Sequence, residues 1–220
     1  TCRIARLIAR GTPPSRILAV TFTNKAAGEM LQRVRSLLGR ATEESPEIST
    51  FHSLCVRILR RQIGKLEFPE RFAIYDQGDQ ESLARQVLRE INVPTAQMRP
   101  SELLYRISLW KSQSVRAEQA VTLATTDREH LAAIAYRRYQ HALKLAGALD
   151  FDDLLLFTED LFRSFPRVRR AEAGRFDQIL VDGPLEYGDL AYRHLEGHLT
   201  CSSLSNVIAT RKDLICSANA

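Results

Sequence analysis

The stretch RILAVTFTNKAAGEMLQRVRSLLG, residues 16–39, decides the fold class of this chain. Residues 16–22 form a short apolar run of strand character, and the residues that follow repeat apolar side chains at helical spacing up to Gly39. A strand, a polar turn and a helix in this order begin a βαβ unit, which predicts an α/β protein with a parallel sheet. The apolar positions expected on one face of the helix are Ala27, Met30, Leu31, Val34, Leu37 and Leu38.

Further strands and helices extend this pattern on both sides of a long helical region. EIST (47–50) is a second strand candidate followed by a helix, and FDQILVD (176–182) is the best strand candidate in the second half. Between them, residues 77–146 are almost wholly helical in character, with breaks at NVPT and MRPS, and residues 150–165 form another amphipathic helix ended by Pro166. The order predicts a parallel sheet interrupted by a helical insertion.

The composition is that of an ordinary soluble globular protein. The chain has 220 residues, of which 45% are hydrophobic and 26% charged, enough for one substantial core with an inserted subdomain. Its four cysteines show no CxxC spacing, which argues against a zinc site or a disulfide framework. Its longest apolar runs fall far short of the roughly 20 residues that a membrane span needs. We therefore expect a cytoplasmic protein with no membrane partner.

Positive charge is concentrated at the start of the chain. The net charge is +5, and residues 1–40 contain eight lysines and arginines against Glu29 as the single acid. Such a segment favours a polyanionic partner, of which nucleic acid is the commonest. The alternative is a solvated helix face rich in arginine.

The segment TFTNKAA (21–27) lies where a strand gives way to a helix, and ligands of open α/β sheets bind at such strand ends. Thr21, Thr23 and Asn24 offer short hydrogen-bonding side chains, and Lys25 offers a positive charge suited to phosphate. Phe22 offers a flat face on which a base could stack. The alternative is a capped helix with a buried phenylalanine.

The segment STFHSLCVRILRR (49–61) repeats this arrangement at the second strand end. Thr50, His52 and Ser53 form a polar cluster at a helix start, and three arginines follow along the same helix. A lone histidine at such a place is more often a structural hydrogen-bonding group than a catalyst, so we assign His52 no role in proton transfer.

Several ordered segments resemble one family. ILAVTFTNKAAGEM (17–30) resembles motif Ia of the UvrD/Rep-type superfamily 1 DNA helicases, and STFHSLCVRILRR resembles their motif Ib. LDFDDLLLF (149–157) is similar to the segment that leads back from their inserted helical subdomain, and FAIYDQGDQ (72–80) matches as well. The resemblance extends over residues 1 to about 200.

The resemblance implies a fold and a division of the chain. The fold would be an incomplete RecA-like (P-loop NTPase) parallel sheet with an inserted all-helical subdomain. Residues 1–76 would form the first part of the RecA-like domain and residues 147–200 the second part, with residues 77–146 as the insertion. Residues 201–220 are expected to form a diverged tail: NVIATRKDLICSANA (206–220) starts like the family's next strand but resembles nothing in the family afterwards, and an unrelated sequence from about Cys201 is the alternative.

The resemblance also implies partners and a set of contact residues. Single-stranded DNA would be the main partner, and a second RecA-like domain or other repair proteins would be further partners. The family uses ATP and magnesium and unwinds DNA in the 3'-to-5' direction, in repair or replication. The positions matching the DNA-contacting motifs are Thr21, Phe22, Thr23, Asn24, Lys25, Thr50, Phe51, His52 and Ser53.

Two departures concern the chemistry of ATP. The 220 residues contain no GxxxxGK[ST] sequence, the P-loop that binds the phosphates of ATP. TCRIARLIARG (1–11) resembles the helix that directly follows this loop in the family. The given sequence is therefore expected to begin downstream of the P-loop. In the family, the strand matching ILVD ends in Asp-Glu; here Asp182 keeps the magnesium position, but Gly183 replaces the glutamate that orients water. Glu186, beyond a proline, is a poor substitute for that base.

These departures predict that the chain alone binds neither ATP nor magnesium and has lost ATP hydrolysis. Asp182 would be a residual catalytic acid, holding magnesium only if ATP were bound. The expected function is that of a fragment or degenerate copy of an ATP-dependent 3'-to-5' DNA helicase that binds single-stranded DNA. The alternatives are a non-catalytic single-stranded DNA-binding module and a helical protein-interaction adaptor, for which Trp110 is a candidate contact.

Overall fold

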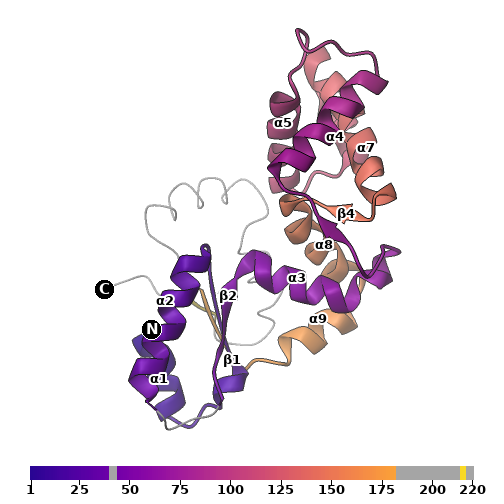
Figure 1. Cartoon of the computed structure of the whole chain (residues 1–220). Helices are drawn as coiled ribbons and strands as arrows, with labels where there is room; N and C mark the ends of the chain where they lie inside the picture. The colour runs from indigo at the N-terminus through magenta and orange to yellow at the C-terminus, as the bar shows by residue number, and fades with distance from the viewer. Residues whose placement is uncertain (40–43, 182–213, 217–220) are drawn as a thin grey trace. The chain divides into compact units, whose positions relative to one another are not determined.

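The computed structural model describes residues 1–39 and 44–181, together with the backbone of residues 214–216. The chain divides into two compact units, drawn in Figure 1. The sheet unit contains, among the described residues, 1–58, 159–181 and 214–216. The helical unit contains residues 59–158. Each unit has a hydrophobic core of its own.

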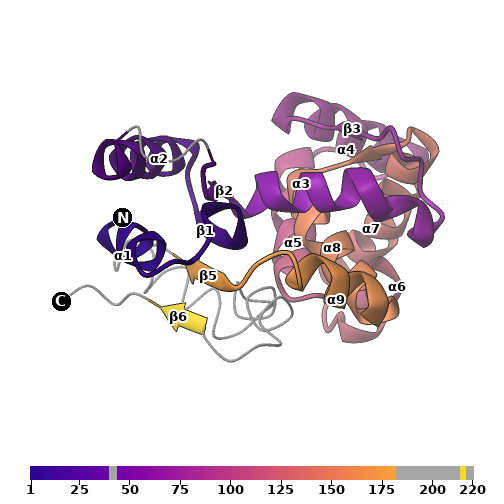
Figure 2. The ribbon, with the colours of Figure 1, turned by 90° about the horizontal axis from the view of Figure 1, so that it is seen from below.

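A small parallel sheet forms the centre of the sheet unit, as predicted. Its strands are β1 (Ile17–Thr21), β2 (Glu47–Thr50), β5 (Gln178–Val181) and β6 (Leu214–Cys216), in the spatial order β2-β1-β5-β6. Figure 2 shows β5 and β6 beside one another, and their pairing is parallel. Because β1 pairs with β5, segments far apart in the sequence lie side by side in the sheet.

Two helices pack on one face of this sheet. They are α1 (Cys2–Ala9) and α2 (Asn24–Leu38), and their buried side chains form one cluster with alternate residues of β1. All five residues of β1 are buried, which is typical of a parallel strand covered on both faces. The cluster consists of Ile4, Ile17, Ala19, Met30, Val34 and Leu180.

The predicted apolar face of α2 is wrong at one position. Met30 and Val34 are buried, but Leu37 is 57% exposed. Leu38, the next residue, still packs against the core cluster, so the buried face of the last turn is narrower than predicted and leaves Leu37 outside it.

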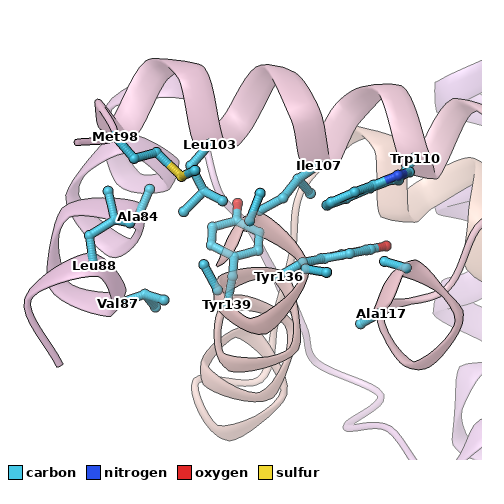
Figure 3. Packing of buried hydrophobic residues seen from close by; sticks show 14 of the residues in the cluster. Ala84, Val87, Leu88, Met98, Leu103, Ile107, Trp110, Ala117, Tyr136 and Tyr139 are labelled. Carbon is cyan, nitrogen blue, oxygen red and sulfur yellow. The ribbon is translucent and has the colours of Figure 1, made fainter. Parts of the chain in front are cut away.

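The helical unit is built around four helices of the predicted insertion. They are α4 (Gln77–Glu90), α5 (Pro100–Ser112), α6 (Ala117–Leu123) and α7 (Asp127–Leu145). Figure 3 shows how their side chains interdigitate: Leu103, Ile107 and Trp110 of α5 lie against Tyr136 and Tyr139 of α7. The rings of Trp110 and Tyr136 are stacked, with centroids 5.9 Å apart and an interplanar angle of 12°.

A two-stranded parallel sheet closes the base of this helical region. It pairs β3 (Ala73–Ile74) with β4 (Ala148–Leu149), and the amides of Ala73 and Tyr75 donate to the carbonyls of Gly147 and Leu149, each at 2.9 Å. The sequence did not predict these strands. Two residues are too few to show the alternation on which strand prediction depends.

The remaining helices are α3 (Phe51–Gln62), α8 (Phe151–Ser164) and α9 (Pro166–Ala173), and short 3-10 turns cover Pro14–Arg16 and Ile63–Leu66. The helices at 51–62 and 151–164 were predicted. α9 was not, because Pro166 was interpreted only as the end of a helix. Proline is also common at the first position of a helix, where its missing amide has no intrahelical partner to lose, and Pro166 begins α9.

Some predictions fall outside the described residues. Asp182, Gly183 and Glu186 lie there, as does the tail from residue 201 onward except for the backbone of β6. Within the described part of the chain, no helix is long and apolar enough to cross a membrane.

Candidate nucleic-acid interface

The two polar segments singled out in the sequence lie next to each other, at the carboxyl ends of the neighbouring strands β1 and β2. Parallel pairing of β1 with β2 places Thr21 opposite Thr50, the last residue of each strand. Phe22 to Lys25 continue from the first strand, and Phe51 to Ser53 continue from the second. All nine predicted contact residues therefore lie at or directly after the carboxyl ends of β1 and β2. Their role as contacts remains a prediction.

The first segment caps α2. Thr21 is buried, and the Thr23 side chain accepts a hydrogen bond from the amide of Ala26 at 3.1 Å, which satisfies one of the free amides at the helix start. Asn24 and Lys25 lie in the first turn and are exposed. Among the described residues, Lys25 has no ion-pair or hydrogen-bond partner, so its charge is available to an anion.

The second segment caps α3. The amide of Ser53 donates to Thr50 Oγ1 at 3.2 Å, and the two side-chain oxygens are 2.8 Å apart. Thr50 is buried and Ser53 half-buried. Both hydroxyls are thus engaged with each other, which gives them a structural role at the start of the helix.

The two phenylalanines that follow the strands are in contact. Their ring centroids lie 5.4 Å apart with an interplanar angle of 51°. Phe51 is only 4% exposed, whereas Phe22 is 36% exposed. The alternative of a buried Phe22 is therefore wrong, although the helix is capped by Thr23 as that alternative assumed. A half-exposed ring on a fixed aromatic neighbour is suited to stacking with a planar ligand.

His52 is half-buried in the first turn of α3, where it interacts with its surroundings. Burial lowers the pKa of its imidazole from the ordinary value of 6.5, because the charged form loses its hydration. Burial therefore disfavours the charged form of the ring that would attract a phosphate. This agrees with a hydrogen-bonding role.

The arginines that follow on α3 have internal partners. Arg57 donates to Glu47 Oε1 at 2.7 Å and to Ser49 Oγ at 2.8 Å. In the helical unit, the Arg60 guanidinium lies 3.9 Å from the centroid of the Phe72 ring. These two arginines have contacts within the chain, whereas Lys25, which follows β1, is exposed and has no ion-pair partner among the described residues.

The basic character of the first 40 residues is also partly internal. Arg16, at the amino end of β1, forms a bidentate pair with Asp177 at 2.6 and 3.1 Å and donates to the Gly174 carbonyl at 2.9 Å. It ties the start of β1 to the turn before β5, which explains the presence of this arginine without any external anion. Arg33 forms a looser exposed pair with Glu29 at 3.5 Å.

The predicted magnesium acid, Asp182, lies outside the described residues, directly after β5. Among the residues that the structure does describe, there is no group of three or more histidine, cysteine, aspartate or glutamate side chains that could hold a metal ion. The prediction of a residual magnesium site stays a prediction.

A buried charge cluster in the helical unit was missed. Lys111 on α5 is fully buried, and its Nζ lies 2.6 Å from Asp150 Oδ2 and 2.7 Å from Asp153 Oδ1. The Tyr139 hydroxyl donates to Asp150 at 3.2 Å, and the Gln140 amide donates to both oxygens of Asp153 at 3.2 and 3.1 Å. The segment Asp150-x-x-Asp153 before an apolar run was the available sequence signal, because this spacing is typical of a helix cap.

The electrostatics of this cluster follow from its burial. Burial alone would lower the pKa of Lys111, but the charges of Asp153 and Asp150 outweigh it and raise that pKa. Burial raises the pKa of Asp153 to about 6, and the nearby charge of Asp150 acts in the same direction against the attraction of Lys111. Because Lys111 and the two carboxylates compensate one another's charge away from solvent, we interpret them as structural, although the buried Gln140 Oε1 has no hydrogen-bond partner.

Trp110, the candidate contact of the adaptor alternative, is buried in the helical core and stacked on Tyr136 (Figure 3). It is therefore not available to a partner protein. The exposed aromatic side chain of this helix is Tyr105, which is 69% exposed and lines an open hollow with Arg99 and Arg128.

Comparison with known proteins gives one consistent result. The family described as UvrD/REP helicase N-terminal domain matches residues 1–195. The chain is 42% identical over 209 residues to "ATP-dependent DNA helicase UvrD1" of Mycobacterium leprae, covering 89% of this chain and 26% of that protein. It is 39% identical over 190 residues to "ATP-dependent DNA helicase PcrA" of Staphylococcus aureus, covering 86% of this chain and 26% of that protein. It is 37% identical over 187 residues to "Probable DNA helicase II homolog" of Mycoplasma capricolum, covering 83% and 26%. The chain thus spans about a quarter of the length of these relatives.

Proposed function

The chain belongs to the UvrD/REP helicase N-terminal domain family, and on this premise we propose that the ends of β1 and β2 form part of a track for single-stranded DNA. One observation carries the proposal: the partly exposed ring of Phe22 and the charge of Lys25, which has no ion-pair or hydrogen-bond partner among the described residues, lie three residues apart directly after β1. A ring and a cation are the two groups that single strands need, one for a base and one for a phosphate.

The local geometry supports a division of labour within the track. Phe22 would stack with a base, because its face is accessible while its position is fixed by Phe51. Lys25 and the amides in the first turn of α2 would face phosphate, since a helix start carries partial positive charge. Thr50 and Ser53, whose hydroxyls are hydrogen-bonded to each other, would hold the start of α3 in place and contribute weakly to DNA affinity.

For any longer protein that contains this chain, we propose the activity that the relatives' names state, ATP-dependent DNA helicase, in the 3'-to-5' direction of the family. The parallel sheet of the sheet unit would then be part of a RecA-like domain, with Asp182 as its magnesium acid. The 220 residues do not fit ATP chemistry on their own, because the sequence has no GxxxxGK[ST] loop and Gly183 follows Asp182.

Binding to a fluorescent oligo-dT, measured by anisotropy at several salt concentrations, tests the DNA track. The 220-residue chain should bind weakly and lose affinity steeply with salt, because each cation on a phosphate releases a counterion. Phe22→Ala should weaken binding by about 1 to 3 kcal/mol at every salt concentration. Lys25→Ala should weaken it mainly at low salt and reduce the salt slope by about 1.

Arg35→Ala is the matched control for Lys25→Ala. Arg35 is an exposed cation of the same helix, ten residues and about 15 Å further along, at the end away from the strand edge. It should leave the salt slope nearly unchanged. Equal effects of the two substitutions would reduce the proposal to non-specific charge attraction, and the absence of binding at low salt would refute it.

We further propose that the 220 residues by themselves hydrolyse no ATP. Phosphoryl transfer depends on a phosphate loop, a metal and a group that positions water, and loss of such an element typically costs orders of magnitude in rate. Phosphate release with magnesium and saturating single-stranded DNA should equal the background. A DNA-stimulated rate that disappears on adding a chelator would contradict this.

A helical adaptor remains the second candidate, and Tyr105 in its hollow is the observation that favours it. Under this alternative, oligo-dT binding would be absent and Tyr105→Ala would disrupt association with a protein partner. Under the DNA proposal, Tyr105→Ala should bind oligo-dT as the unsubstituted chain does.

A further inference from the structure

The ring of Phe51 is buried beside the proposed DNA track and is not itself accessible to a base. We propose that Phe51 is a positioning residue, which holds the ring of Phe22 in the half-exposed orientation that stacking requires. This inference rests on the proposed function, since it concerns how the track presents its aromatic face.

The strand register explains why the two rings meet. Thr21 and Thr50 are paired across the sheet, and each is followed immediately by a phenylalanine. The ring centroids are 5.4 Å apart and tilted by 51°. This distance lies within the range at which aromatic pairs attract each other, and the tilt is intermediate between stacked and edge-to-face packing.

The backbone on both sides of this pair is fixed by helix caps. Thr23, directly after Phe22, accepts a hydrogen bond from Ala26, and Thr50, directly before Phe51, accepts one from Ser53. With the main chain held, the remaining freedom of Phe22 is rotation of its own side chain. Contact with a ring that is 4% exposed removes part of that freedom from one side.

A ring that is already ordered loses less conformational entropy when a base stacks on it. Phe51 would therefore raise affinity without touching the DNA, and its effect would be confined to the part of the binding energy that depends on bases. This sets it apart from Lys25, whose effect would be confined to the part that depends on phosphates.

The test compares oligo-dT with an abasic oligonucleotide of equal length, using the full 220-residue chain and anisotropy. The ratio of the two dissociation constants measures the contribution of the bases. Phe22→Ala should bring that ratio close to one. Phe51→Leu, which keeps an apolar side chain but removes the flat ring, should lower the ratio about threefold to tenfold. It should leave abasic binding and the salt slope unchanged.

The double variant Phe22→Ala/Phe51→Leu should bind as Phe22→Ala alone does, because Phe51 acts through Phe22. Phe51→Tyr, which retains a ring, should restore most of the ratio. Ile58→Val, a buried change on the same helix away from the ring pair, is the control for mild destabilisation and should keep the full ratio.

Each other outcome has a definite meaning. A Phe51→Leu chain that keeps the unsubstituted ratio, or that weakens dT and abasic binding equally, overturns the positioning role. If circular dichroism shows that Phe51→Leu is unfolded, Phe51→Met is measured in its place with the same expected loss. An unsubstituted chain that binds neither oligonucleotide refutes the DNA track itself, which is a different result from loss of the positioning role.

Discussion

Lys25 and Lys111 show how the same side chain takes opposite roles in the two units. Lys25 lies in the first turn of a capped helix, exposed and without a partner among the described residues. Lys111 is fully buried between two carboxylates at 2.6 and 2.7 Å. The difference is in their partners, and it cannot be read from residue type or local charge.

The same comparison extends to the surroundings of the two lysines. Near Lys111, the two aspartates accept hydrogen bonds from the lysine, from the Tyr139 hydroxyl and from the Gln140 amide group, so removal of the lysine leaves buried carboxylates without their counterion. Near Lys25, the positive charge is exposed and has no partner among the described residues, and a phosphate of DNA is the partner that we propose for it.

Replacing each lysine by methionine tests this contrast most strongly. Lys111→Met should lower the free energy of unfolding of the helical unit by about 3 to 5 kcal/mol, because two buried carboxylates lose their counterion. Lys25→Met, in the sheet unit, should change the free energy of unfolding of that unit by less than about 0.5 kcal/mol, followed by circular dichroism. Trp110 is the only tryptophan of the chain and lies in the helical core, so its fluorescence in urea reports the unfolding of that unit. Similar costs at both positions would remove the distinction.

The buried cluster should also respond to pH. The pKa of Asp153 is raised from 3.8 to about 6, so the folded state takes up a proton more readily than the unfolded state. The ionised carboxyl therefore costs stability at pH 7.5, and part of this cost is relieved as the pH falls through 6. Between pH 7.5 and 5.0, the unsubstituted chain should gain stability, on the order of 1 kcal/mol, relative to Asp153→Asn.

The measurement is the difference in unfolding free energy between the two proteins at each pH, again from Trp110 fluorescence. Asp152, whose pKa is also raised by burial, is present in both proteins, so its contribution largely cancels. A difference that does not vary with pH would show that Asp153 is not titrating in the folded protein.

Two threonine caps give a smaller and closely matched comparison. Thr23 accepts from the amide of Ala26 at 3.1 Å in the sheet unit, and Thr126 accepts from the amide of Glu129 at 3.2 Å in the helical unit. Changing either to alanine should cost about 1 kcal/mol of stability. Oligo-dT binding should weaken for Thr23→Ala and stay unchanged for Thr126→Ala. If both variants bound oligo-dT more weakly, the weaker binding of Thr23→Ala would be explained by its lower stability alone.

Gly28 gives the smallest expected effect. It lies inside α2, a Cβ built there meets no atom within 4 Å, and its φ is not in the left-handed region. Gly28→Ala should therefore stabilise the sheet unit by about 0.5 to 1 kcal/mol. Gly39, which ends the same helix at φ +60°, is the control, because alanine there is strained and should destabilise. Thermal melting followed by circular dichroism compares the two, and a destabilising Gly28→Ala would contradict the prediction.

The regular parts of the fold were predictable, because periodicity and cap residues are local properties. The strands at 17–21, 47–50 and 178–181 and the helix at 24–38 were predicted with nearly correct limits, and both polar segments were predicted to follow strand ends. The breaks between α5 and α6 and between α6 and α7 were not predicted. They contain no proline or glycine, so the usual signals of a helix end are absent.

Contacts between distant residues were not predictable from local patterns. From the sequence alone, Lys111 would be predicted to be an ordinary exposed lysine of a helix. Its partner Asp150 lies 39 residues away in the sequence. Arg57 reads as a phosphate-binding candidate until its pairing with Glu47 and Ser49 is known. The contact of Phe22 with Phe51 depends on the exact register of two strands. Residue type indicated where charge and rings lie, and packing determined which of them remain available.

The short pairing of β3 with β4 has a consequence for the evolution of such chains. Ala73 donates to Gly147 and Tyr75 donates to Leu149, so the polypeptide leaves for the helices and returns within hydrogen-bonding distance of its departure point. The segment between the two strands is an insertion whose ends are held together by these backbone hydrogen bonds, whatever its length. Helices can be lengthened, added or exchanged inside it without moving either end, which makes this segment a natural place for lineages to diverge in architecture.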